Sequence, residues 1–238
     1  MPDWQAEAII LSVRPHGEGS AVVSVLTADY GRHAGLVRGG ASSKMRGIMQ
    51  PGNRVRVSWR ARLSEQLGQM QIELVQSIPA LLLDSPLRLS GVASMCALLD
   101  GALPEREAQP GLFEGSAALL DVIVLDDDNA GWVEGYVRWE LGLLAAVGYR
   151  LDLARCVASG QTNDLAFVSP KTGRAVSRGA AGDWAARLLP LPPMLLGQGP
   201  ATPAELAQGF ALTSHFLTKG FEPLLNGKPL PEARSRLL

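Results

Sequence analysis

Short runs in which apolar and polar residues alternate fill the first 78 residues of the chain, a pattern typical of β-strands. The pattern predicts five strands, at Ala6–Arg14, Ser20–Leu26, His33–Arg38, Asn53–Leu63 and Met70–Val75. Turn signals such as Asp29-Tyr30-Gly31-Arg32 and Pro51-Gly52 stand between them. Five short strands joined by glycine-rich turns predict a small closed barrel.

The apolar spacing changes to three and four residues from Pro86 onward, which indicates helices. Four helices are predicted, at Leu87–Leu103, Leu112–Leu125, Trp132–Val147 and Ala204–Leu217. Residues 150–200 are irregular and contain six glycines and five prolines, with short strands predicted at Leu165–Val168 and Ala175–Ser177.

The order of these elements predicts an α+β protein with two domains. We place a five-stranded barrel at residues 1–80 and a mainly α-helical domain at 81–238, with a loop-rich insertion at 150–200. The strand pattern fits an oligonucleotide-binding (OB) barrel and equally allows an SH3-like barrel.

The fourth predicted strand has arginines on one face and apolar residues on the other. Arg54, Arg56, Arg60 and Arg62 share one parity, whereas Val55, Val57, Trp59 and Leu63 share the opposite one. Like charges on one strand face repel each other, whereas an extended polyanion would pair with each guanidinium. The alternative is a solvent-facing strand that happens to use arginine.

Charge is distributed unevenly, although the formal net charge is −1 and the pI is about 6.3. Residues 30–64 contain eight basic side chains and no acid, and residues 100–134 contain nine acids and one base. This asymmetry indicates a polyanion partner for the barrel. It also raises the hypothesis that the acidic helical domain folds back onto the barrel and inhibits it.

We find no pattern that predicts catalysis or a cofactor. Cys96 and Cys156 form no metal-binding spacing, and His16, His33 and His215 are widely separated. No Walker lysine motif and no Gly-x-Ser-x-Gly elbow occurs. The run Asp126–Asp128 is typical of a solvated loop, and a hydrolase using this cluster is only a third hypothesis.

The chain has no apolar run long enough to cross a bilayer and no secretory leader, so we expect a cytoplasmic protein without a membrane partner. Aromatic residues near the basic set are few, and Trp59 shares parity with the core valines. Phosphate contact should therefore dominate binding, with a log–log salt slope of roughly 0.7 per phosphate on a single strand.

Several motifs, in order and at matching spacing, resemble the bacterial RecO recombination mediator family over nearly the whole chain. They are Trp4–Leu11 with Arg14–Glu18, Leu36–Lys44, Gln50–Gly52, Tyr136–Leu141 with Gly148–Leu153, Phe167–Pro170 and Leu225–Leu230. The resemblance implies an N-terminal OB fold, a helical domain and a non-enzymatic role. That role is to bind single- and double-stranded DNA, to anneal complementary strands, and to help RecR load RecA onto strands coated by single-stranded-DNA-binding protein.

The resemblance places Arg38, Lys44 and Arg46 in the family's basic loop, and we expect the DNA site to include other barrel cations. The expected DNA-binding residues are Arg14, Arg32, Arg38, Lys44, Arg46, Arg54, Arg56, Arg60 and Arg62. Arg138 and Trp139 resemble part of the region that holds the acidic C-terminal tail of the single-stranded-DNA-binding protein. An exposed arginine on a core helix is the alternative for Arg138.

The chain departs from the family pattern in the loop-rich insertion, where many members carry four zinc-binding cysteines. Only Cys156 occupies such a position, and Ser159 and Ser177 stand near the others. One thiolate cannot hold Zn²⁺ tetrahedrally, so we predict no metal. The alternative function is a protein–protein adaptor whose helical domain binds partners and whose basic face is incidental.

Overall fold

The computed structural model describes residues 2–40, 42–126, 130–221 and 229–237. Asp127, Asp128 and residues 225–228 of the last family motif lie outside these ranges. The chain divides into two compact units, residues 1–125 with 231–237, and residues 126–230. The first compact unit extends past residue 80. The domain boundary placed there from the sequence stays a prediction.

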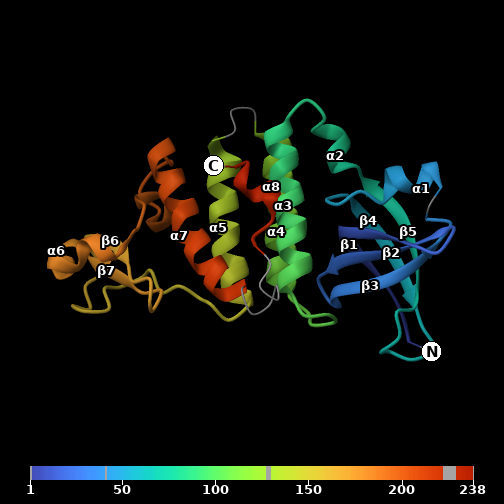
Figure 1. The fold of residues 1–238 in the computed structure, drawn as a ribbon, viewed down its shortest axis with the longest axis horizontal. Coiled ribbons are helices and arrows are strands. Elements are labelled where there is room, and N and C mark those ends of the chain that lie inside the picture. Colours follow the sequence, from blue (N-terminus) through green and yellow to red (C-terminus); the bar gives the residue numbers. More distant parts are fainter. Residues whose placement is uncertain (1, 41, 127–129, 222–228, 238) are drawn as a thin grey trace. The chain divides into compact units, whose positions relative to one another are not determined.

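Five strands of the first unit form a closed barrel in the order β1-β2-β3-β5-β4. They are β1 (Asp3–His16), β2 (Ser20–Thr27), β3 (Gly31–Arg38), β4 (Arg54–Arg60) and β5 (Gln69–Gln76). β3 pairs with β5 in parallel, and the helix α1 (Ser43–Ile48) lies between β3 and β4 in the chain (Figure 1). The five-stranded closed barrel is consistent with the predicted OB fold.

Alternating side chains fill the barrel interior, as the period of two predicts. On β4, Val55, Val57 and Trp59 are buried, and they pack with residues from the other strands. Trp59 donates its indole N–H to the Leu67 carbonyl at 2.9 Å, so its polar atom is satisfied inside the protein. The interior is a packed core that holds the outer face of the sheet in register.

The predicted arginine strand was too long at its end. β4 stops at Arg60, opposite Asp3, where its partner β1 begins, and the Ala61 amide donates to the Pro2 carbonyl beyond the ladder. Arg62 therefore lies past the strand. A second correction is α1, which forms where the sequence indicated a loop.

Four further helices occur among the described residues of the first unit: α2 (Ile78–Leu81), α3 (Pro86–Ala102), α4 (Pro110–Leu125) and α8 (Glu232–Ser235). α3 contacts β1 and α4, and α8 returns from the far end of the chain to pack on α3 (Figure 1). At Gly52, a Cβ atom would lie 2.2 Å from the Val92 side chain. The barrel and α3 approach each other this closely only because residue 52 has no side chain.

The described part of the second unit contains two long helices and a small sheet. Its elements are α5 (Ala130–Ala146), β6 (Leu165–Val168), β7 (Ala175–Ser177), α6 (Arg178–Ala181), η1 (Gly182–Arg187), β8 (Leu189–Pro190), η2 (Pro193–Leu196) and α7 (Pro203–Phe221). α5 packs against α7, and the sheet has the order β7-β6-β8. The predicted α+β class and the helices are thus confirmed.

Candidate nucleic-acid interface

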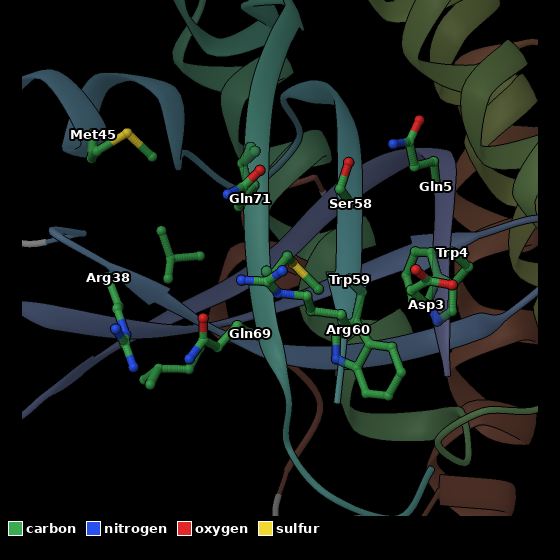
Figure 2. Close-up of a pocket in the computed structure, with 14 residues that line it drawn as sticks. Asp3, Trp4, Gln5, Arg38, Met45, Ser58, Trp59, Arg60, Gln69 and Gln71 are labelled. Atoms are coloured by element: carbon green, nitrogen blue, oxygen red, sulfur yellow. The ribbon is translucent and has the colours of Figure 1, made fainter. Parts of the chain in front are cut away.

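A groove of about 670 Å³ crosses the outer face of the barrel. Strands β1, β3, β4 and β5 and helix α1 contribute its walls. Figure 2 shows Arg38 and Met45 at one side of the groove, and Asp3, Trp4 and Gln5 at the other. The groove therefore joins the basic end of β3 to the start of β1.

The floor of the groove carries neutral polar side chains in register. Ser58 on β4 stands opposite Gln5 on β1 and opposite Gln71 on β5. Directly opposite residues of antiparallel strands point to the same face, so these three side chains form one row (Figure 2). Amide and hydroxyl groups can both donate and accept hydrogen bonds, as base edges and sugars require.

Helix α1 is fixed at both of its ends. The Ser42 hydroxyl accepts a hydrogen bond from the Met45 amide at 3.4 Å, which caps the first turn. The buried Asn53 amide donates to the carbonyls of Gly47 and Ile48, which caps the last turn. Met45 and Ile48 pack on the barrel core, and the basic side chains of the helix are exposed.

We define the α1 patch as Arg14, Arg38, Lys44 and Arg46. All four side chains are exposed, and none of them forms an ion pair with any acid in the part of the chain that the structure describes. Arg38 lines the groove, and Lys44 and Arg46 follow it on α1. The nearest acid in sequence is Glu18, in the β1–β2 turn. Arg38, Lys44 and Arg46 therefore form an accessible excess of positive charge beside one end of the groove, and Arg14 is a further exposed base on β1.

Two of the expected DNA-binding arginines are engaged inside the protein instead. Arg32 lies 3.5 Å from both Asp100 and Glu105 and donates to the Leu103 carbonyl at 2.7 Å. Arg54 lies 2.9 Å from Asp121 on α4 and also donates to the Ala117 carbonyl. Both side chains are mostly covered, so they link the barrel to α3 and α4.

The other β4 arginines are exposed but have acidic neighbours across the sheet. Arg56 stands between Glu7 on β1 and Glu73 on β5, and Arg60 stands between Asp3 and Gln69. Opposite charges on adjacent strands stabilise a sheet. The arginine strand therefore has a structural reason for its charge, which the sequence pattern by itself did not reveal.

An aromatic cluster lies behind one wall of the groove. The Trp4 ring stacks on Tyr30 at 4.3 Å and lies 5.7 Å from Trp59, and the His33 ring meets both indoles edge-on. Neither ring nitrogen of His33 has a hydrogen-bond partner among the described residues. Burial, assisted by the charge of Arg106, lowers the pKa of His33 to about 4, so the imidazole is neutral at pH 7.

In the second unit, the two residues expected at the partner site are adjacent on α5 but differ in accessibility. Arg138 donates to Glu134 at 2.7 Å and to the Met194 carbonyl at 2.6 Å, and its side chain is 45% exposed. Trp139 is only 6% exposed and packs against Tyr136. Arg138 is thus the accessible member, and it is held in place by its own neighbours.

Cys156 organises the insertion where the family pattern has metal ligands. Its sulfur accepts hydrogen bonds from the Ser159 amide at 3.4 Å, from the Ser177 amide at 3.3 Å and from the Ser177 hydroxyl at 3.4 Å. Burial raises the pKa of this thiol, but these donors outweigh it and lower the pKa to about 6. Within the described ranges, no three His, Cys, Asp or Glu residues are grouped so that they could hold a metal ion.

Sequence reasoning missed the polar row and the acids that flank β4. The signal was present as alternate glutamines at Gln69 and Gln71, but their partners depend on strand register.

No helix in the described part of the chain has the length and apolar character needed to span a membrane.

Comparison with known proteins matches both halves of the chain to family models. Residues 1–78 match the N-terminal model of recombination protein O, and residues 83–225 match its C-terminal model. The DNA repair protein RecO of Cereibacter sphaeroides is 55% identical over 238 residues, which cover 100% of this chain and 98% of that protein. RecO of Jannaschia sp. is 49% identical over 236 residues, covering 99% and 95%. RecO of Rhodospirillum centenum is 48% identical over 238 residues, covering 99% and 93%.

Proposed function

Because the chain belongs to the recombination protein O (RecO) family of DNA repair and recombination proteins, we propose that it is a non-enzymatic mediator that binds and anneals DNA. Single-stranded DNA is the principal ligand in this proposal, and double-stranded DNA binds to the same cationic surface. In this proposal, the protein binds and anneals DNA in the cytoplasm, at the nucleoid.

The observation that carries the proposal is the α1 patch beside the groove. Exposed cations without acidic partners attract phosphates and release counterions when they bind them. The row Gln5–Ser58–Gln71 offers hydrogen bonds to sugars and bases along the neighbouring floor. Binding through phosphates and neutral amides is weakly sequence-specific, as a protein that handles any broken strand requires.

The positive charge of the α1 patch also supports the annealing of complementary DNA strands. Two strands approach each other against phosphate repulsion, and a shared cationic surface lowers that repulsion without any covalent step. No nucleophile, general base or metal is needed for this reaction. The chain therefore requires no catalytic residue for the proposed role.

Protein partners complete the proposal: RecR, the acidic tail of the single-stranded-DNA-binding protein, and RecA indirectly. Arg138 supports the tail contact, because a half-exposed guanidinium beside an aromatic residue suits a carboxylate. The tail would compete with Glu134, which already accepts from this arginine.

The decisive experiment is fluorescence anisotropy of a labelled single-stranded oligonucleotide, titrated with the full chain at several salt concentrations. The variant Arg38→Gln/Lys44→Gln/Arg46→Gln should bind more weakly, and its log–log salt slope should fall by about 2, at roughly 0.7 per lost phosphate contact. Strand annealing by the same variant should slow in parallel.

A matched control removes the same charge from the same barrel. The variant Arg56→Gln/Arg60→Gln/Arg62→Gln should change binding and slope less, because Glu7, Glu73 and Asp3 already offset the positive charge of Arg56 and Arg60 in the parent protein. A larger loss in this control would place the DNA on β4 instead. Equal, unchanged binding by both variants would favour the adaptor alternative.

A further inference from the structure

Trp184 is an exposed tryptophan in the loop-rich insertion of the second unit. Its side chain lies in η1 and the residue is 63% exposed, whereas Trp59, Trp132 and Trp139 are at most 6% exposed. Indole is the largest apolar side chain, and one left in water at a fixed position is typical of a contact surface.

The indole is held by a cation on one of its faces. The Arg187 guanidinium carbon lies 5.0 Å from the ring centroid, within the range of a cation–π contact. Because the residue is 63% exposed with this cation in place, much of the ring surface remains accessible, and a positive charge sits beside it.

The surrounding insertion carries an excess of positive charge. Residues 150–200 contain three acids, Asp152, Asp164 and Asp183, against six bases, Arg150, Arg155, Lys171, Arg174, Arg178 and Arg187. Asp152 pairs with Arg174 at 3.5 Å, and Asp164 pairs with Arg178 at 3.5 Å. Only Asp183 is left to balance the other four bases. The region favours a polyanionic partner over a basic or a neutral apolar one.

We propose that Trp184 and Arg187 form a second contact site for single-stranded nucleic acid, separate from the barrel groove. A base stacks on the accessible indole surface, and Arg187 meets the adjacent phosphate. Stacking is tolerant of sequence because every base has a π-face, so the site suits the same strands as the barrel. A protein with two such sites can hold two segments of single strand at once.

The test uses the full chain and a thymidine oligonucleotide. Saturating oligonucleotide should quench part of the tryptophan emission, and Trp184→Phe should lack that quenched component. Trp184→Ala should weaken binding about fivefold to tenfold, whereas it should not change binding to an abasic oligonucleotide of equal length. Trp184→Phe should retain most of the affinity.

Photocrosslinking of an iododeoxyuridine oligonucleotide should map to the peptide that contains Trp184. The α1 patch variant should keep this crosslink, so failure of the barrel proposal and failure of this one are distinguishable. Arg174→Gln removes the same charge from the same insertion and should affect binding less than Arg187→Gln.

Several outcomes would overturn the proposal. One is that Trp184→Ala binds the oligonucleotide with unchanged affinity and shows unchanged quenching of its tryptophan emission. Another is that Trp184→Ala loses as much affinity for the abasic oligonucleotide as for the thymidine oligonucleotide. Quenching of Trp184 by a polyglutamate peptide, with none by the oligonucleotide, would assign the surface to an acidic protein partner instead.

Discussion

His33 is a buried imidazole set between the two indoles of the barrel, and no residue that the structure describes hydrogen-bonds to its ring. It is 4% exposed, and the charged form would lose its water without gaining an acceptor. The pKa of about 4 reflects this burial first and the nearby Arg106 second. The barrel therefore tolerates His33 only as a neutral ring, which makes its stability depend on pH.

Protonation of His33 should make the folded protein less stable in acid. The unfolded chain takes up the proton near pH 6.5 and folded His33 near pH 4, so acid favours the unfolded state within this window. The free energy of unfolding should fall by about 3 kcal/mol between pH 7 and 4 through this group. Urea unfolding at several pH values measures it. His33→Phe should flatten the dependence of the unfolding free energy on pH, whereas His16→Phe, at an exposed site, should not. An unchanged pH dependence in His33→Phe would refute the assignment to His33.

At the scale of an element, β4 combines two kinds of arginine on one outer face. Arg54, at its start, is covered and bonded to α4, whereas Arg56 is exposed between two glutamates. The strand alternates in burial as its sequence predicts, but its charges do not act as one set. Position along the strand decides whether an arginine supports the fold or faces the solvent.

The two arginines should therefore differ in their effect on stability. Arg54→Met loses an ion pair and a carbonyl acceptor contact, and it should lower the free energy of unfolding by about 1–2 kcal/mol. Arg56→Met should stay within about 0.5 kcal/mol of the parent. Thermal unfolding of both variants checks this. Equal stabilities would mean that the Asp121 contact contributes nothing to the fold.

At the scale of the whole molecule, the chain returns to its first unit after building its second. Residues 231–237 join residues 1–125, and α8 packs on α3. Arg234 and Leu237 of this segment are buried. The last described residues are thus part of the unit that contains the barrel, although more than one hundred residues separate them from α4.

Truncation after Leu230 should destabilise the first unit. Burial of a leucine side chain alone contributes about 2 kcal/mol, so the truncated chain should unfold at clearly lower urea concentration. Arg236→Ala is the matched control, because this exposed side chain pairs only with Glu232 of the same helix, among the described residues. If the truncated and full chains unfold at the same urea concentration, α8 does not support the barrel unit.

Local patterns in the sequence determined the elements and the class of the fold. The period of two located the barrel strands, the spacing of three and four located the helices, and ordered motifs indicated the family. These signals are short in range, because they reflect how one strand or one helix buries its own apolar face. The short helix α1 was missed because its support comes from Asn53, which caps it from the following turn.

Only the tertiary structure decided which cations are accessible. Arg32 bonds to a carbonyl 71 residues away and Arg54 to one 63 residues away, and strand register sets Glu7 and Glu73 beside Arg56. A sequence pattern counts charges along the chain, whereas a field in space depends on which opposite charges the fold brings near. The sequence located the basic module. Long-range packing covered Arg32 and Arg54, set acids beside Arg56 and Arg60, and left the α1 patch exposed without an ion pair among the described residues.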